Sequence, residues 1–492
     1  MNPRFVNWLA LLPLAAVLGA CGAFAPPVPM PPTTAPAMAE PAQWQSPVPT
    51  GGSLGDLRQW WQQFDDPVLL ALVDAAQAAS PSIASAASRI EQARAARVGA
   101  GAALLPSVDL GASALRTRAD MVNPVYSASG ASVQASWEID AFGANAAARD
   151  AAQLRLEGAQ AGWYDARISV AAEVATTYNA LRGCEALVQI TAADVASRNE
   201  TARLSEQSAH AGLLAPANAA LSRASAAQGR NLLAAQRAQC DQLVKSLVAL
   251  TALDESALRR QLAGGAAKLP QPATIAVDRV PGEALMQRPD LLAAERQVLA
   301  AAEDTARSQA QRYPRIGISG SLGPAVMRVQ NTTLNGTLWT LGPLQVSLPV
   351  FDGGALQANV VAARARYDES VSVYRGLVRS AVREVESALV TLDSTARREA
   401  DAKLAAEGFD ASLKAADARY KGGLGSLFDL EEARRSALVA NSTLVELQQQ
   451  RVAAWISLYR ALGGGWDAAQ LAADPATTAA TAALAAVANP AR

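Results

Sequence analysis

The stretch Y-K-G-G-L-G-S-L-F-D-L-E-E, residues 420–432, decides how the second half of the chain folds. Three glycines fall within four positions, and glycine readily adopts the backbone conformations that a chain reversal requires. Helical patterns occupy 355–421 before the stretch and 427–462 after it. The stretch therefore predicts the tip of a helical hairpin, with Asp429 and Glu432 one turn apart just beyond the reversal.

An internal repeat gives this tip a counterpart. V-Q-A-S-W-E-I-D-A-F-G at 133–143 aligns with L-Q-V-S-L-P-V-F-D-G-G at 344–354, an offset of 211 residues (344 minus 133). The same offset places A-G-L at 211–213 on G-G-L at 422–424. We infer that the chain is one unit duplicated, with a second helical hairpin that turns at Gly212.

Each repeat has the same predicted order: a short helix, two strands, a very long helix, a glycine turn and a medium helix. The first repeat, 56–253, has these elements at 82–104, 107–140, 145–211 and 216–252, and the second, 289–462, has them at 289–312, 315–351, 355–421 and 427–462. Residues 254–288 link the repeats. A long helix of this kind would be on the order of 100 Å long at about 1.5 Å per residue.

The two ends of the chain lie outside the repeats. Val6 to Ala20 is an apolar run that ends in L-G-A-C, so residues 1–20 are typical of an exported signal peptide, and the ending is similar to a bacterial lipobox that would lipidate Cys21. An ordinary signal peptide followed by an unrelated cysteine is the alternative. Residues 21–55 are rich in Pro, Ala and Thr and predict an extended tether. The last segment, 463–492, predicts a disordered tail from about Ala472.

Clean alternation of apolar with small or polar residues marks the strands, as in Val133 to Asp140 and Leu344 to Phe351. The hairpin tips are predicted at Asn123-Pro124 and at 331–336. The strands fit either a half-buried soluble sheet or a sheet with one face in lipid. Lipid permits only closed barrels, and about eight strands are the minimum, so the membrane alternative requires several chains.

Composition excludes several classes of function. The net charge of -1 argues against a nucleic-acid partner. The chain has one histidine, His210, so histidine-based catalytic triads and metal sites are disfavoured. The glycines at 422–425 are not followed by the lysine of a phosphate-binding loop. We predict no enzyme activity and no cofactor.

Two further cysteines are placed symmetrically about the first turn. Cys184 and Cys240 average to position 212, and residues equidistant from a hairpin turn lie opposite each other on antiparallel helices. In an exported protein they could form a disulfide, and a pair of buried free thiols is the alternative.

Several motifs together resemble one known family. They are the L-G-A-C leader, W-W-Q-Q-F-D-D-P at 60–67, R-P-D-L-L-A-A-E at 288–295, Y-P at 313–314, L-P-V-F-D-G-G at 348–354 and the glycine-rich tips. From Trp60 to about Leu462 the chain resembles the TolC-like outer membrane efflux proteins, close to the lipidated (NodT-like) subgroup that serves tripartite drug-efflux pumps.

The resemblance implies a mostly α-helical, duplicated chain with a membrane β part. Three chains would form a twelve-stranded outer-membrane barrel, four strands from each, continuous with a periplasmic helical barrel. The homotrimer would sit in outer membrane lipid through Cys21 and its barrel. It would be the passive exit duct for drugs delivered by an inner-membrane pump of the resistance-nodulation-division type through a periplasmic adaptor.

The resemblance also assigns roles at the tips. Asp429 and Glu432 fall where acidic rings constrict the periplasmic entrance of the family, and Tyr420 falls at a gate tyrosine. Gly425 stands where some members have an arginine that bonds to that tyrosine, and Asn218 stands at the position equivalent to Asp429. Without the resemblance, the two acids would simply complement a helix dipole. The implied adaptor-docking residues are Gly212, Leu213, Gly422, Gly423, Leu424 and Gly425.

Other functions remain open at this stage. An exit duct for type I protein secretion or for metal efflux has the same architecture, although no cluster of methionine or histidine supports metal handling. A non-conducting structural trimer is a different class, and the polar strand face and the acidic tip favour a conduit over it.

Overall fold

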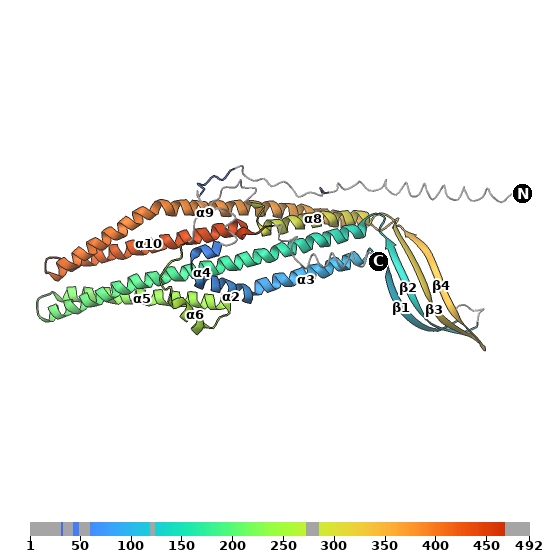
Figure 1. Cartoon of the computed structure of the whole chain (residues 1–492), viewed down its shortest axis with the longest axis horizontal. Helices are drawn as coiled ribbons and strands as arrows, with labels where there is room; N and C mark the ends of the chain where they lie inside the picture. The colour runs from blue at the N-terminus through green and yellow to red at the C-terminus, as the bar shows by residue number, and fades with distance from the viewer. Residues whose placement is uncertain (1–30, 33–42, 49–59, 119–123, 272–284, 468–492) are drawn as a thin grey trace. The chain divides into compact units, whose positions relative to one another are not determined.

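The computed structural model describes residues 31–32, 43–48, 60–118, 124–271 and 285–467 (Figure 1). The chain forms two compact units. One contains Ser88–Gln160 and Leu292–Arg375, and the other contains Met38–Ala87, Ala161–Leu291 and Gly376–Arg492. The predicted signal peptide, Cys21, the turn at Asn123 and the tail beyond Asp467 lie outside the described residues.

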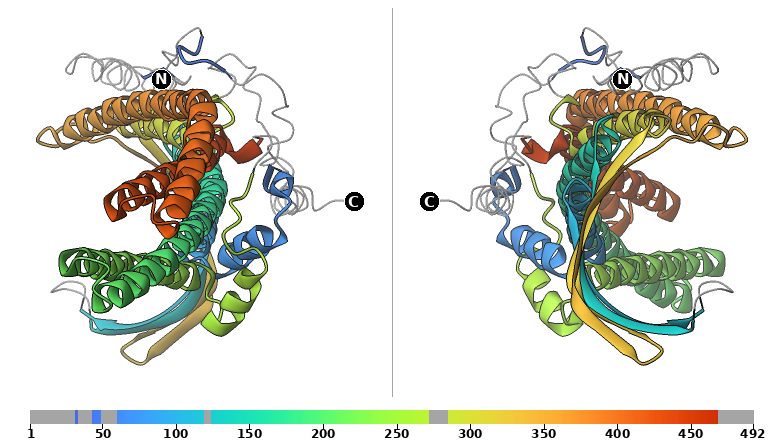
Figure 2. Two further views of the ribbon diagram at one scale, coloured as in Figure 1. Left: turned by 90° about the vertical axis from the view of Figure 1, so that its left-hand side faces the viewer. Right: turned by 90° about the vertical axis from the view of Figure 1, so that its right-hand side faces the viewer.

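The first unit contains a four-stranded antiparallel sheet in the order β1-β2-β3-β4. The strands are β1 (Ser107–Thr117), β2 (Tyr126–Ile139), β3 (Arg315–Val329) and β4 (Thr332–Ser347). They run side by side and curve strongly along their length (Figure 2). Strands β2 and β3 approach so closely that a Cβ on Gly323 would lie 1.9 Å from the carbonyl oxygen of Ala131, so this position requires glycine.

The β-hairpin formed by β3 and β4 differs from its prediction at both ends. Of the turn predicted at 331–336, only Asn331 lies in the observed turn. Gln330, with a φ of 52°, is the other turn residue, and residues from Thr332 onward already belong to β4. The strand predicted to reach 351 ends at Ser347. Pro349 explains the early end, because proline has no amide hydrogen to donate to the neighbouring strand.

Large apolar side chains of the sheet are exposed in the described part of the chain. Leu110 in β1 is 80% exposed and Leu341 in β4 is 82% exposed, and the neighbouring polar positions of β1 are exposed as well. A half-buried soluble sheet would cover its apolar face. The exposure therefore favours the alternative in which that face meets lipid.

Helices occupy most of the rest of the chain. The long helices α4 (Ala144–His210) and α9 (Ala355–Lys421) contain 67 residues each. Every helix predicted in the two repeats starts and ends within about two residues of a helix in the structure. The others are α2 (Pro67–Ala79), α3 (Pro81–Ala102), α5 (Pro216–Thr251), α6 (Glu255–Ala263), α8 (Pro289–Ala310) and α10 (Leu427–Ala461). Helices α2 and α6 have no separate prediction from the sequence.

None of the described helices is both long and apolar enough to cross a membrane alone; only α2 and α3 taken together reach that level, and they are bent by 46° at their junction.

The core of the second unit is built around aromatic side chains. Trp60 is 1% exposed and stacks on Tyr459, with ring centroids 4.8 Å apart, and Trp61 and Phe64 pack beside them. Burial raises the pKa of Tyr459 to about 12. The tryptophan pair is therefore a packing anchor of this core.

Polar contacts fix the start of α2 within this core. Asp66 caps the helix, its Oδ1 accepting from the amides of Val68 and Leu69. Its other oxygen accepts a 2.6 Å hydrogen bond from the hydroxyl of Tyr178, and burial raises the pKa of that tyrosine. The W-W-Q-Q-F-D-D-P motif thus supplies both the anchor and the cap.

The R-P-D motif joins three helices. Arg288 is 7% exposed, and its Nη1 donates to Glu384 Oε2 on α9 and to the carbonyl of Ala461 at the end of α10, each at 3.0 Å. Its Nη2 lies 2.8 Å from Asp290 on α8. Because one buried guanidinium binds all three helices, it fixes where they meet.

Candidate functional site

The two helical tips share one hydrogen-bonding pattern. At the second tip, Leu424 N donates to Arg419 O at 2.8 Å and Gly423 N donates to Tyr420 O at 3.0 Å, with Gly423 at a φ of 72°. These bonds define a Schellman motif, which needs a residue of positive φ after the helix. The first tip has the same motif. There, Leu213 N donates to Ser208 O, Gly212 N donates to Ala209 O, and Gly212 has a φ of 75°.

Both tips present a leucine to solvent. Leu213 is 83% exposed and Leu424 is 78% exposed. His210, the last residue of α4, is also exposed. Gly425 is held close to the helix end, because a Cβ there would lie 3.2 Å from the amide nitrogen of Tyr420. The space at 425 thus suits a residue without a side chain.

Asp429 is committed to the start of α10. Its amide donates to Ser426 Oγ at 3.1 Å, and its Oδ2 accepts from the amide of Ser426 at 3.3 Å, so the two residues form a capping box. At the first tip Ala215 stands at the cap position and cannot cap with its methyl group. The acid and the cap are therefore features of the second tip.

Glu432 lies on the same exposed face of α10 as Asp429. It forms an ion pair with Arg435 at 3.0 Å, and the side chains are 53% and 69% exposed respectively. An exposed pair of this kind is weak, so the Glu432 carboxylate is available to ions. The two predicted acids therefore differ in the structure: Asp429 caps α10, and Glu432 is exposed to solvent.

Tyr420 links the two hairpins of the second unit. Its hydroxyl lies 3.0 Å from Ser205 Oγ on α4. Residue 425, a glycine, has no side chain to bind this tyrosine, and the serine of the other hairpin is its partner. No motif in the sequence marks Ser205.

Sequence reasoning also missed a set of buried charges behind the tip. Glu431, Arg434 and Arg198 form ion pairs with side chains that are 1–11% exposed. The spacing of Leu427, Leu430, Glu431 and Arg434 could have indicated them, because these positions fall on one face of a helix.

Comparison with known proteins identifies the family. The outer membrane efflux protein family model matches residues 72–253 and 280–464, one match for each repeat. The chain belongs to the outer membrane efflux protein family.

Individual members of this family match over nearly their full length. The pyoverdine export outer membrane protein OpmQ of Pseudomonas putida is 30% identical over 479 residues, covering 94% of this chain and 98% of that protein. Outer membrane protein OprJ of Pseudomonas aeruginosa is 30% identical over 429 residues, covering 85% and 88%. The outer-membrane channel OprN superposes with a TM-score of 0.77 at 25% identity, covering 90% of this chain and 99% of that structure.

The likeness settles the coarse function. The protein is an outer membrane efflux channel with the TolC-like fold, and channels of this family are trimers that work with adaptor proteins and inner-membrane pumps. The family and the relatives named above are efflux, export and channel proteins. The acidic tip is therefore the candidate site at which an efflux channel of this family would control passage.

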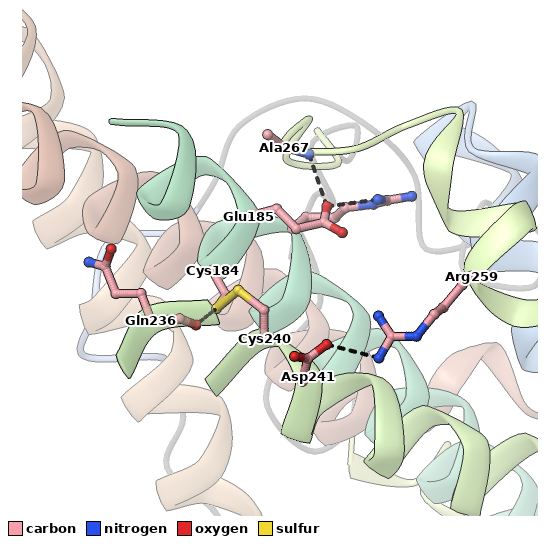
Figure 3. Close-up of a disulfide and its surroundings, with 8 residues drawn as sticks. Cys184, Glu185, Gln236, Cys240, Asp241, Arg259 and Ala267 are labelled. Atoms are coloured by element: carbon pink, nitrogen blue, oxygen red, sulfur yellow. Dashed lines mark hydrogen bonds and ion pairs between the residues drawn. A yellow bond between two sulfur atoms is a disulfide. The ribbon is translucent and has the colours of Figure 1, made fainter. Parts of the chain in front are cut away.

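The first hairpin of this efflux channel is cross-linked. Cys184 on α4 and Cys240 on α5 form a disulfide, with their Cα atoms 5.7 Å apart (Figure 3). Of the two alternatives drawn from the sequence, the structure contains the bonded pair.

Ion pairs surround the disulfide. Glu185 accepts from Arg182 at 2.8 Å and from the amide of Ala267 at 2.9 Å, and Asp241 pairs with Arg259 of α6 at 2.8 Å (Figure 3). The residues next to each cysteine thus bind the segment that follows α5. The disulfide belongs to the anchored part of the hairpin, well away from the tip.

Proposed function

We propose that three copies of the chain form a cation-favouring gate at the periplasmic entrance of the channel. In a threefold assembly, Asp429 and Glu432 each become a ring of three carboxylates at the tip of α10. Rings of like charge select ions of the opposite sign and repel those of the same sign. The observation that carries the proposal is the exposed carboxylate of Glu432 on the first turns of α10.

The two acids would contribute unequally. The capping box holds Asp429 against the start of α10, whereas Glu432 contacts only an exposed arginine. The Glu432 ring would therefore supply most of the selectivity, and Asp429 would mainly keep the first turn of the helix formed.

Tyr420 would hold this entrance closed. Its hydrogen bond to Ser205 runs from the end of α9 to α4 and so joins the moving tip to the other hairpin. One neutral hydrogen bond contributes about 0.5–1.5 kcal/mol, so it can be broken when a partner binds.

The glycine turns would dock the periplasmic adaptor. Gly212, Leu213, Gly422, Gly423, Leu424 and Gly425 form two Schellman turns of the same geometry, each with an exposed leucine. Two equal turns per chain would give a trimer six equivalent contacts. The inner-membrane partner would be a pump of the resistance-nodulation-division type.

Cys21 would carry the lipid that anchors the tether to the outer membrane. The L-G-A-C ending of the leader supports this assignment. The substrates would be small organic molecules, because relatives are named for the export of pyoverdine and the efflux of solvents and toluene. Protein secretion and metal efflux have no such support.

Single-channel recording of the purified trimer tests the proposal. Glu432→Gln should move the cation-to-anion permeability ratio towards one and raise conductance, and Asp429→Asn should do so less. Glu446→Gln is the matched control, because Glu446 is an exposed acid farther along α10. Selectivity that is unchanged in Glu432→Gln, or changed equally in the control, would refute the charged ring.

A further inference from the structure

A cluster of charged side chains lies buried behind the tip, between the two helical hairpins of the second unit. Its members are Asp194 and Arg198 on α4, Ser225 on α5, and Glu431 and Arg434 on α10. The four charged side chains are only 10%, 11%, 11% and 1% exposed. Charges so well removed from water need both partners and hydrogen bonds.

Glu431 is the centre of this cluster. Its Oε2 accepts from Ser225 Oγ at 2.6 Å and from Arg198 Nη1 at 3.2 Å, and its Oε1 accepts from Arg434 Nη1 at 2.7 Å. Arg198 is in turn held by Asp194, 2.7 Å from its Nε. One carboxylate of the second hairpin thus binds both helices of the first.

Arg434 also connects α10 to α4, but as a hydrogen-bond donor. Its Nη2 donates to Ser197 Oγ at 2.8 Å and to Thr201 Oγ1 at 2.6 Å, both on α4. Together, Glu431 and Arg434 send hydrogen bonds in both directions across the boundary between the hairpins. Most other ion pairs near the tips join residues three or four positions apart on one helix.

Buried ion pairs differ from apolar packing in the effect that the loss of one partner has on stability. A complete pair contributes little net stability, but removing one partner leaves an uncompensated buried charge, which is strongly unfavourable. The boundary could have been packed with leucine, as Leu427 and Leu430 are on the same face of α10. A charged cluster instead specifies one arrangement of the hairpins and penalises intermediate ones.

We propose that this cluster is a clasp that holds the tip of α10 closed against α4 and α5, with Glu431 as its positioning residue. The inference rests on the proposed gate at Asp429 and Glu432. Glu431 precedes Glu432 directly and is turned from it by about 100° around the helix axis, with a side chain 11% exposed against 53% for Glu432, so it fixes where the exposed acids lie. Opening the entrance requires the clasp to release, in addition to the hydrogen bond of Tyr420.

The first test is Glu431→Gln in single-channel recordings of the full trimer. The amide keeps the size and the bond to Ser225 but leaves Arg198 and Arg434 without their shared carboxylate. We expect about tenfold higher open probability, since breaking a buried pair is far costlier than breaking an exposed one. Arg203→Gln is the matched control, because Arg203 pairs with Glu200 on the surface of the same helix as Arg198. Equal opening in both variants overturns the clasp.

A second variant covers the case in which Glu431→Gln fails to assemble. Arg434→Gln with Glu431→Gln removes one charge of each sign and leaves Arg198 paired with Asp194. We expect this double variant to trimerise and to open more than the wild type. If it trimerises and opens no more than the wild type, the clasp is overturned.

Hydrogen exchange separates the clasp from the gate. In the full-length trimer, amides of residues 427–440 should exchange about tenfold faster in Glu431→Gln than in the wild type or in Arg203→Gln. This readout does not require conduction, so it tests the clasp even if the acidic ring fails its own test. Unchanged exchange in this segment overturns the proposal.

Discussion

The disulfide between Cys184 and Cys240 makes a quantitative prediction for the first hairpin. Replacing both cysteines by serine removes a covalent link between α4 and α5 that closes a loop of 56 residues around the tip. The folded packing should change little, because only the two sulfurs are lost and the ion pairs of Glu185 and Asp241 stay in place. The effect should therefore lie in the unfolded chain.

The size of the effect follows from the length of the closed loop. For a separation of 56 residues, the chain-entropy relation gives about 14 cal/mol/K, or about 4 kcal/mol at room temperature. Residual helix in the denatured hairpin would already restrict the chain, so about 4 kcal/mol is an upper figure. We expect Cys184→Ser with Cys240→Ser to lower the free energy of unfolding by about 2–4 kcal/mol per chain.

Urea unfolding of the detergent-solubilised trimer, followed by far-ultraviolet circular dichroism, measures this loss. Reducing the wild type with dithiothreitol should reproduce it, and dithiothreitol should leave the double serine variant unchanged. Conductance of folded trimers should not change, because the bond lies far from the tip. A loss below about 0.5 kcal/mol, or rapid labelling of the unreduced wild type by a thiol reagent, would refute the reasoning.

Three smaller predictions concern the second unit. Tyr178→Phe removes the hydrogen bond to Asp66 and should lower the free energy of unfolding by about 1–2 kcal/mol in urea titrations. Gly463, at a φ of 77°, would place a Cβ 2.2 Å from the carbonyl oxygen of Gln287, so Gly463→Ala should cost about 3 kcal/mol in the same assay. Burial and nearby carboxylates raise the pKa of Asp165, so its charge costs stability at neutral pH and costs none once pH falls below the unfolded pKa of about 4. Asp165→Asn should therefore melt at a higher temperature than the wild type at pH 7 and lose that advantage near pH 4; an advantage that grows on acidification would contradict the sign.

The helices were predictable because local signals mark their ends. Long uninterrupted patterns define α4 and α9, and glycine follows each where a positive φ is required, at Gly212 and Gly423. The duplication made each tip a check on the other. The fold class, including the need for several chains to close a barrel, followed from strand alternation and the family resemblance, and the relatives and solved structures confirm it.

The errors arose where pairing partners, not local residues, decide the structure. The turn residues Asn335 and Gly336 suggested a loop, but β3 supplies partners for them, Val326 and Ala325, and the strand continues through both. Tertiary pairing overrides local turn preference in such cases. The end of β4 was placed too late because alternation continues past Ser347, although Pro349 cannot donate to a partner.

The tip of α10 shows why two acids were found and a third was missed. Leu427, Leu430, Glu431 and Arg434 recur at the spacing of one helical face and are the positions turned inward. Asp429 and Glu432 lie on the opposite, exposed face. Sequence reasoning treats a carboxylate as a surface group, because an acid is almost never buried without a partner.

The partners of Glu431 are more than 200 positions away, on α4 and α5 (Arg198 and Ser225, separated from it by 233 and 206 residues), so nothing near residue 431 announces them. These partners give the adjacent residues Glu431 and Glu432 different roles. Glu432 faces the ions that pass, and Glu431 holds the helix that carries it. Changes to these two adjacent acids should therefore act on different quantities, Glu432→Gln on selectivity and Glu431→Gln on open probability. A selectivity change of the same size in both variants would show that the two faces of α10 are not separate.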